Sequence, residues 1–467
     1  RPVMIANMAL LAWPVISLVF YLTMPAGRAT IWTLLGGYLL LPVMASFDLP
    51  GLPSFDKDSI PNLTVMILAP IMARRGEFRW PRSTTVNLLM LLFVLVPIGT
   101  TITNRDAITI GSVTLPGLDW WETMSYSVSN ALTLAPFILG AAMLNTERGH
   151  LDLLKAFVLG ALIYTLPVLA EIRLSPLLHD KIYGIYNGLF MQQIRYGGFR
   201  AMVFLGHGLL ISAYFAMALM AAIGLWRMKV RMFTLPMALV AALFVLVLIL
   251  NKTMGPIVLL ALFVPLFLFL NSRKYLAVLL GIAMLIVAYP FLRGADLAPV
   301  RSFSEAIRPL STERAASLKF RLDNEDLLLH RASMKPVFGW GRFGRSRVII
   351  LTDWGEARDI TTTDGGWVIA IGISGWAGYI ATFGLLTYPF LRAFRLPRLP
   401  LSMARLTLVT LLLLNVVDLI PNSSLRPITW LIAGALAGMT AASLRKGAVM
   451  RVTRPPSAQD EARALPA

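Results

Sequence analysis

The stretch SLKFRLDNEDLLLHRASMKPVFGWGRFGRSRV occupies residues 317–348 of a chain that otherwise consists of successive hydrophobic runs. It lies within the longest polar segment, residues 293–366, which runs into the sequence TTTDGGW (361–367). Residues 293–366 contain 12 Lys and Arg and 10 Asp and Glu. Charges in a hydrophobic protein gather where they meet water and a charged ligand. We therefore expect the hydrophobic runs on either side to support this segment.

The composition predicts an all-α, polytopic membrane protein. Of the 467 residues, 57% are hydrophobic and only 14% are charged, whereas soluble domains average about 25% charged residues. Repeated apolar runs of about 20 residues match the length of a bilayer-spanning helix. We expect about 12–14 transmembrane helices and one large, partly helical periplasmic loop. Because the chain begins with Arg1, we leave open whether a further segment precedes it.

Thirteen apolar spans can be read from the sequence. They are residues 3–24, 29–46, 60–73, 85–101, 124–144, 154–169, 201–226, 234–250, 256–270, 275–292, 367–391, 406–420 and 428–444. The spans divide the chain into transmembrane helices over 1–292, with a short Arg-bearing periplasmic loop near 173–200, a large periplasmic loop over 293–366, and C-terminal transmembrane helices over 367–444. Residues 445–467 are expected to form a disordered cytoplasmic tail, since they are polar and rich in Pro and Ala.

Basic connections set the expected orientation. The clusters Arg74–Arg82, Arg227–Arg231, Arg273–Lys274, Arg392–Arg405 and Arg445–Arg454 each follow an odd-numbered span. Cytoplasmic loops collect Lys and Arg, so these turns are predicted to face the cytoplasm. Residues 173–200 and 293–366 then face the periplasm. The second segment is long enough to cross regardless of its charge, so its Arg residues call for another explanation.

Composition and motifs also exclude several functions. The net charge of +18 is explained by the cytoplasmic loops, so nucleic-acid binding is not expected. The chain has no Cys, which excludes disulfides, thiol catalysis and Cys-based metal sites. It contains no P-loop, GxGxxG or HExxH motif, so nucleotide, dinucleotide and zinc-hydrolase functions have no support.

Two helices and a tight turn are predicted inside the large loop. Apolar residues recur at helical spacing through 311–326 and 327–335. Pro336 is expected to end the second helix. The sequence GWGRFG (339–344) supplies three glycines for a tight turn. Such helices, lying at the membrane surface, would cover a cavity between the spans.

Two arginines near residue 200 are the first candidate ligands for a phosphate. Arg195 and Arg200 lie in QQIRYGGFRAM (192–202), on either side of Gly197 and Gly198. Glycines allow close approach of a ligand, and guanidinium groups bind phosphate oxygens in pairs. The alternative is that both side chains reach out to lipid headgroups.

The large loop supplies the remaining main candidates. Arg321 and Arg331 could hold a diphosphate, and His330 between them could titrate near neutral pH. The alternatives are an ion pair of Arg321 with Glu325 four residues away and a structural His330. Asp364 could remove a proton from a sugar hydroxyl, or it could cap the following helix.

Weaker signals come from four further positions. Asp56 and Asp58 form a D-x-D pattern, but hard cations want several oxygen ligands and no partner cluster is evident, so no metal site is expected. Asp418 shares a helix face with Asn415 near the end of its span and is a secondary candidate, or else it joins helices together. His207 faces the same choice, with a structural role favoured.

Together these motifs resemble the O-antigen ligase and O-antigen polymerase superfamily of bacterial membrane glycosyltransferases of the GT-C type. The resemblance covers about residues 195–438. It rests on RYGGF (195–199), on an Arg followed by a helix and PVFGWG (336–341), on DGGWVIAIGISGWAGYIATFGLL (364–386), and on PNSSLRPITWLIAGALAG (421–438).

The resemblance implies an inverting, metal-independent and cofactor-free transfer of glycan from undecaprenyl pyrophosphate to a sugar hydroxyl at the periplasmic face. It implies that Arg195 or Arg200, together with Arg321, holds the pyrophosphate. The ligases have a His where this chain has Asp364, which puts a ligase assignment in doubt and makes the base a carboxylate. We therefore expect a polysaccharide polymerase that acts on a lipid-linked oligosaccharide and an acceptor glycan. The alternatives are an O-antigen ligase and, from another class, a transporter of lipid-linked glycan.

Overall fold

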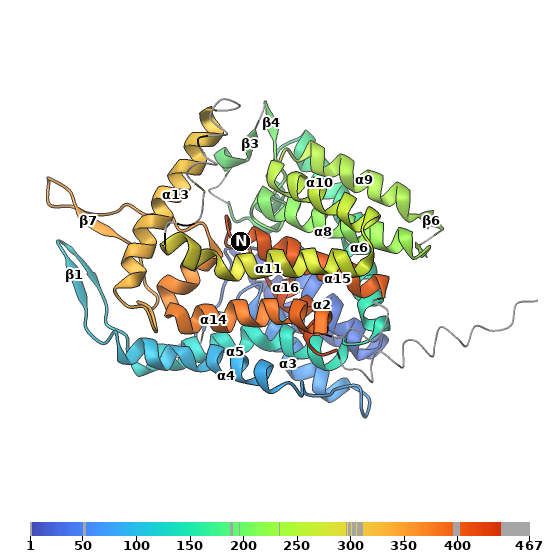
Figure 1. The fold of residues 1–467 in the computed structure, drawn as a ribbon, viewed down its shortest axis with the longest axis horizontal. Coiled ribbons are helices and arrows are strands. Elements are labelled where there is room, and N and C mark those ends of the chain that lie inside the picture. The colour runs from blue at the N-terminus through green and yellow to red at the C-terminus, as the bar shows by residue number, and fades with distance from the viewer. Residues whose placement is uncertain are drawn as a thin grey trace, which may run out of the picture.

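The computed structural model describes residues 2–49, 53–186, 190–195, 197–232, 234–295, 312–395 and 402–439, together with Leu297, Val300 and Glu305. The chain is predominantly helical (Figure 1). The long helices are α1 (Pro2–Thr23), α2 (Ala26–Leu40), α3 (Ser59–Met72), α4 (Thr84–Ile102), α5 (Trp120–Met143), α6 (Glu147–Arg173), α8 (Gly208–Arg227), α9 (Met237–Leu250), α10 (Met254–Phe269), α11 (Ser272–Gly294), α13 (Thr312–Ser333), α14 (Gly366–Arg395), α15 (Met403–Asp418) and α16 (Pro427–Ala437).

Short elements join these helices. Helix α7 (Leu178–Tyr183) precedes a single 3-10 turn, and four antiparallel hairpins follow helix ends. The hairpins are β1 (Ile108–Ile110) with β2 (Val113–Leu115), β3 (Ile194–Arg195) with β4 (Gly198–Phe199), β5 (Arg231–Met232) with β6 (Leu235–Pro236), and β7 (Ile349–Leu351) with β8 (Ala357–Asp359).

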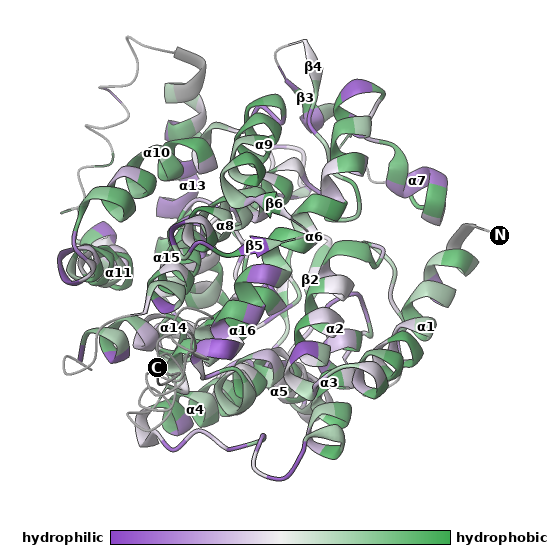
Figure 2. Ribbon diagram, turned by 90° about the vertical axis from the view of Figure 1, so that its right-hand side faces the viewer, coloured by the Kyte–Doolittle hydropathy of each residue, from purple (hydrophilic) through white to green (hydrophobic). Residues whose placement is uncertain are grey.

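Each of the thirteen apolar spans read from the sequence corresponds to a helix. Seven helices in the described residues are long and apolar enough to cross a membrane, namely α1, α4, α5, α6, α8, α11 and α14. Helices α3, α9, α10 and α16 are apolar but shorter. Figure 2 shows hydrophobic residues over most of the apolar helices, whereas α7, α13, helix ends and connections carry more hydrophilic residues. The chain is therefore compatible with a multi-pass membrane protein.

Some boundaries differ from the expectation. The seventh span begins at Gly208 rather than at residue 201, because the backbone N–H groups of Met202 and Val203 turn to bond the buried carboxylate of Glu171, each at 2.8 Å. The two helices predicted over 311–335 form the single helix α13. The predicted tail over 445–467 lies outside the described residues.

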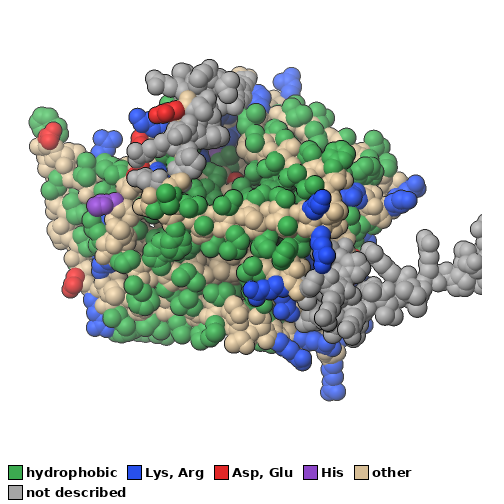
Figure 3. All heavy atoms as spheres, viewed as in Figure 1, with side chains coloured by type: hydrophobic (Ala, Val, Ile, Leu, Met, Phe, Trp, Pro, Cys, Tyr) green, Lys and Arg blue, Asp and Glu red, His purple; other side chains and the backbone are tan. Residues whose placement is uncertain are grey.

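Several basic connections and helix ends lie together at one end of the molecule. Arg79, before α4, donates its backbone N–H to Ala142 O at the end of α5, and Arg392, in the last turn of α14, donates to Met439 O just after α16. In Figure 3, Lys and Arg side chains gather toward the right-hand end, and Asp and Glu lie to the left of them. Helix α13 and the β1–β2 and β7–β8 hairpins lie at the left-hand end (Figure 1).

Helix α14 is broken at Gly375, and the loop after α13 fills the break. Gly375 has φ 63° and ψ −167°, which no helix contains. The N–H groups freed by the break, those of Trp376 and Ala377, donate to Pro336 O and Val337 O at 2.8 and 3.1 Å. In return, Trp340 N–H and Gly341 N–H donate to carbonyls of α14. The loop at 336–341 therefore completes the hydrogen bonding of α14, as buried backbone requires.

The turn predicted over 339–344 is confirmed. Gly339, Gly341 and Gly344 all have positive φ, a conformation open to glycine at little cost. Asn104 at the end of α4 donates to Gly339 O at 2.9 Å, and Thr100 donates to Phe338 O at 2.7 Å. The turn is thus held between α4 and α14.

Helices α5 and α16 cross at close range through glycine. A Cβ added at Gly434 would lie 1.9 Å from Phe137 O, and one at Gly140 would lie 2.3 Å from Leu431 O. Small residues permit such contact between helices in membrane proteins. This crossing sets the position of the α15–α16 connection, which borders the candidate site.

Candidate functional site

A cavity of about 290 Å³ lies between α13, the segment before α14, and the end of α15. We call it the α13–α14 cavity. Its lining includes the side chains of Arg321, Asn324 and Glu325 from α13, and of Thr362 and Asp364. The other lining residues are mostly apolar, among them Leu318, Phe320, Leu328 and Val368. The cavity therefore joins two predicted site residues, Arg321 and Asp364, which are 43 positions apart in sequence.

Arg321 and Asp364 face each other across this cavity. The Nε atom of Arg321 lies 3.6 Å from Oδ2 of Asp364, and the two side chains are 36% and 40% exposed. Arg321 Nη1 also donates to Pro421 O at 3.2 Å. Ion pairs this open to water contribute little to stability, so an anionic ligand can replace the carboxylate at low cost.

The backbone around Asp364 is held by neighbours from two elements. The buried side chain of Asn324, one turn along α13 from Arg321, accepts a hydrogen bond from Thr362 N–H at 2.8 Å. Gly366 N–H, at the start of α14, donates to Leu419 O and Asn422 O. The start of α14 is therefore held by carbonyls of the α15–α16 connection, and the Asp364 carboxylate is directed to Arg321.

The predicted alternative partner of Arg321 is bonded elsewhere. Glu325 lies 3.6 Å from Nε of the buried Arg293, and Arg293 Nη2 contacts Asp326 at 2.7 Å. Glu325 also accepts a hydrogen bond from Tyr289. Burial raises the pKa of Glu325, against the opposing attraction of Arg293. These contacts fasten α13 to the end of α11, so the Arg321–Glu325 pair is replaced by a structural cluster around Arg293.

Arg331 and His330 have structural surroundings. The guanidinium of Arg331 lies 3.5 Å from the ring centroid of Trp340 and donates through two nitrogens to Arg345 O. Burial lowers its pKa. His330 is exposed on the outer face of α13. Neither residue lines the α13–α14 cavity, so Arg331 is placed to hold the GWGRFG turn rather than a ligand there.

The turn also carries an arginine that sequence analysis missed. Arg342 stacks on Tyr126 of α5, with 3.8 Å between guanidinium carbon and ring centroid, and its one hydrogen bond within the described residues goes to Ser129 Oγ at 3.4 Å. By contrast, Arg345 is buried and donates to carbonyls of Trp340, Pro116 and Asp106. In the sequence Arg342 lies between glycines, a pattern that predicts a turn and does not indicate a ligand-binding role.

Arg342 borders two further cavities. A linking cavity of about 270 Å³ shares Leu328 and Val368 with the α13–α14 cavity and contains Arg342 and Phe343. An α5 cavity of about 220 Å³ also contains Arg342 and Phe343, and is lined by the start of α5 and the end of α4. The three cavities are therefore neighbours in a series from Asp364 to α5, each sharing lining residues with the next.

A fourth cavity of about 230 Å³ lies between α4, α5, α14 and α16. It is lined mainly by hydrophobic side chains such as Phe93, Ile369 and Trp430. It shares Ile369 and Ile373 with the linking cavity. We call it the interhelical cavity.

Arg195 and Arg200 lie in the β3–β4 hairpin and do not line the α13–α14 cavity. Arg195 is exposed, whereas Arg200 is buried and donates to Gln193 and Gln192. Burial and the repulsion of Arg195 lower the pKa of Arg200 to about 10. Burial and both arginines lower the pKa of His207 to about 4, and neutral His207 caps α8 by accepting from Leu209 N–H. Arg195 and Arg200 therefore form a second positive cluster, which lies outside the cavity that contains Arg321.

The weaker candidates hold loops together. Asp418 accepts hydrogen bonds from Asn422 and Ser424 within the α15–α16 connection. Asp56 accepts from the backbone and side chain of Ser59 at the start of α3, and Asp58 forms an ion pair with Arg426 at 3.2 Å. Among the described residues no group of three His, Asp or Glu side chains could hold a metal ion.

Comparison with known proteins identified no relative. No protein-family model matches this chain, and no curated protein matches it significantly. A function for this chain has therefore to be argued from the residues of the cavities.

Proposed function

We propose that this protein is a polysaccharide polymerase that transfers glycan repeat units from undecaprenyl pyrophosphate to the hydroxyl of an acceptor glycan. The observation that carries the proposal is the pairing of Arg321 with Asp364 across one cavity. The pair combines a cation for the leaving group with a carboxylate for the nucleophile. Its position on α13 and before α14 matches the motifs on which the resemblance to the O-antigen ligase and polymerase superfamily depends.

Arg321 would bind the diphosphate. A guanidinium offers two parallel N–H donors that match phosphate oxygens. Arg321 is paired loosely with Asp364 at 3.6 Å, and a diphosphate carries more charge than one carboxylate. Donor binding would therefore take Arg321 away from Asp364 and leave that carboxylate free to accept a proton.

Asp364 would act as the general base. The acceptor hydroxyl oxygen attacks the anomeric carbon of the donor sugar, and its proton passes to Asp364. The bond between that carbon and the diphosphate oxygen breaks, and undecaprenyl pyrophosphate leaves with the electron pair. Because the leaving group is already stable, charge stabilisation and positioning supply most of the catalysis. The resemblance implies that no metal or cofactor takes part.

The proposal includes an orientation in the membrane. All thirteen apolar helices would lie in the bacterial inner membrane, with residues 293–366 on the periplasmic face and the basic connections on the cytoplasmic face. The interhelical cavity, which adjoins the linking cavity, would take the first isoprene units of the lipid tail. The exposed Arg195, which forms no ion pair with a described acidic residue, would bind a second lipid-linked diphosphate, whereas the buried Arg200 donates to Gln192 and Gln193 and would position the hairpin.

An assay on purified protein separates the candidate functions. The protein in detergent is given an oligosaccharide on undecaprenyl pyrophosphate, and the products are resolved by gel electrophoresis. A polymerase yields a ladder of glycan lengths together with free undecaprenyl pyrophosphate. A ligase yields product only when a second acceptor such as lipid A core is added. If no new glycosidic bond forms under either condition, the proposed enzyme activity is wrong and transport becomes the better account.

A further inference from the structure

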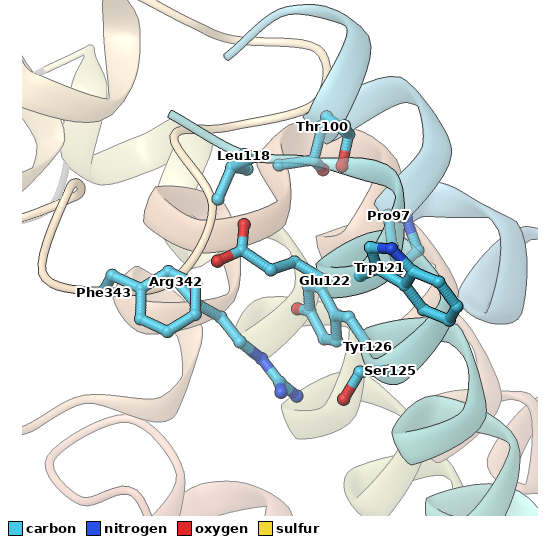
Figure 4. Close-up of a pocket in the computed structure, with 10 residues that line it drawn as sticks. Pro97, Thr100, Leu118, Trp121, Glu122, Ser125, Tyr126, Arg342 and Phe343 are labelled. Carbon is cyan, nitrogen blue, oxygen red and sulfur yellow. The ribbon is translucent and has the colours of Figure 1, made fainter. Parts of the chain in front are cut away.

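The α5 cavity has two exposed aromatic side chains on opposite sides. Figure 4 shows Phe343 and Trp121 facing each other across the cavity, with Glu122 and Tyr126 between them. Trp121 is 68% exposed and Phe343 is 51% exposed. Both rings line the cavity and are only partly packed against the protein, so their faces are accessible to a ligand.

The backbone of Phe343 has an unfavourable conformation. Its φ is +61°, a left-handed conformation that is an outlier for a bulky residue. The neighbours Gly341 and Gly344 have the same sign of φ, so a glycine at 343 would suit the turn better. An unfavourable backbone conformation that holds an exposed side chain over a cavity points to a functional role for that side chain.

Polar groups complete the cavity. Glu122 and Asp119 form a capping box at the start of α5, in which one oxygen of Glu122 accepts from Asp119 N–H at 3.1 Å. The other carboxylate oxygen accepts no hydrogen bond from a described residue. Ser125 and the guanidinium of Arg342 lie on the same side as Tyr126 (Figure 4). Most of the N–H donors of Arg342 are unused by described residues, since its single bond is to Ser129.

We infer that the α5 cavity binds one sugar ring of the growing glycan, held between Trp121 and Phe343. A pyranose ring presents apolar faces and a rim of hydroxyls. The two aromatic side chains match the faces, and the carboxylate and guanidinium between them match the hydroxyls. The inference rests on the proposed function, because it takes the glycan to run from Asp364 through the linking cavity to α5. The cavity volume of about 220 Å³ is of the order of a single ring.

Aromatic residues at the ends of membrane helices commonly meet lipid headgroups, and the test must separate that role from glycan binding. The protein is placed in nanodiscs of uncharged lipid and immobilised for surface plasmon resonance. The probes are oligosaccharides of one to four repeat units, released by hydrolysis from the polysaccharide of cells in which this chain is native. The variants are Trp121→Ala and Phe343→Gly, with Trp354→Ala as the control. Trp354 is 91% exposed at the β7–β8 turn and lines none of the cavities described above.

Wild type and Trp354→Ala are expected to bind the oligosaccharides equally. Each cavity variant should bind about tenfold more weakly, the ratio expected for loss of one aromatic contact. Phe343→Gly should keep or raise the melting temperature, because it relieves the left-handed conformation. Two results would overturn the inference. One is equal binding by all four proteins, and the other is no binding by wild type at about 1 mM probe. If the polymerase assay gives a ladder but the variants bind the oligosaccharides as wild type does, the proposed function is supported and the inference about the α5 cavity is wrong.

Discussion

Arg321 and Asp364 owe their proximity to contacts that neither residue makes itself. Asn324 ties the segment of Asp364 to α13, and the cluster of Arg293 with Glu325 and Asp326 ties α13 to α11. These contacts fix the distance between cation and carboxylate while leaving both open to water. A site that must exchange one anion for another needs this combination of fixed position and weak pairing.

Asp364→Asn should slow turnover by a factor of about 10² or more, the contribution of a general base. Donor affinity should be unchanged or higher, because the substitution removes a negative charge next to the bound diphosphate. Initial rates over a range of donor concentrations separate the two effects. Turnover equal to wild type would show that Asp364 only shapes the segment before α14.

At this scale the sequence predicted the two residues that share the cavity, whereas Arg331, predicted with them, lies outside it. A guanidinium next to a helix end is equally suited to phosphate and to backbone carbonyls, and Arg331 contacts Trp340 and Arg345 O. Arg342, Phe343 and Trp121 were missed as a group because more than 200 positions separate Trp121 from the turn. No local pattern indicates that such distant residues line one cavity.

At the scale of elements, the break in α14 determines where the cavities lie. The loop at 336–341 can enter only because Gly375 leaves the helical conformation, and the turn that follows then carries Arg342 and Phe343 to α5. The thirteen helices themselves were predictable, since apolar runs of that length are helical in a membrane. The break was not, because the carbonyls that accept from Trp376 and Ala377 each lie 40 positions earlier in the sequence.

Gly375→Ala should destabilise the protein by about 2 kcal/mol or more, from a left-handed residue with a Cβ and from overlap with its neighbours. The added Cβ would lie 2.3 Å from Val337 O. The matched control is Gly281→Ala in α11, where a Cβ meets nothing within 4 Å and helix propensity favours alanine by up to about 1 kcal/mol. Thermal unfolding in detergent compares the two variants. Equal melting temperatures would mean that the break in α14 is not under steric control.

At the scale of the whole molecule, the proposed function requires the two ends to face opposite compartments. The chain has no Cys, so single cysteines can be introduced without background. Trp354→Cys, at the end with α13, should react with a membrane-impermeant maleimide in intact spheroplasts. Arg75→Cys, among the exposed basic connections, should react only after permeabilisation, because loops rich in Lys and Arg stay in the cytoplasm. The reverse pattern would place the cavities inside the cell and exclude a periplasmic donor.

The central claim is that Arg321 holds the diphosphate of the lipid-linked donor, and donor binding tests it most directly. Binding of undecaprenyl pyrophosphate to purified wild type, Arg321→Gln and Lys319→Gln is measured in detergent by native mass spectrometry. Lys319 is the matched control, because it is an exposed cation on the same helix that does not line the cavity. Loss of one charge-assisted contact of about 1.5–3 kcal/mol should weaken binding to Arg321→Gln by a factor of ten or more, while Lys319→Gln binds as wild type does. Equal binding by all three proteins would contradict the claim.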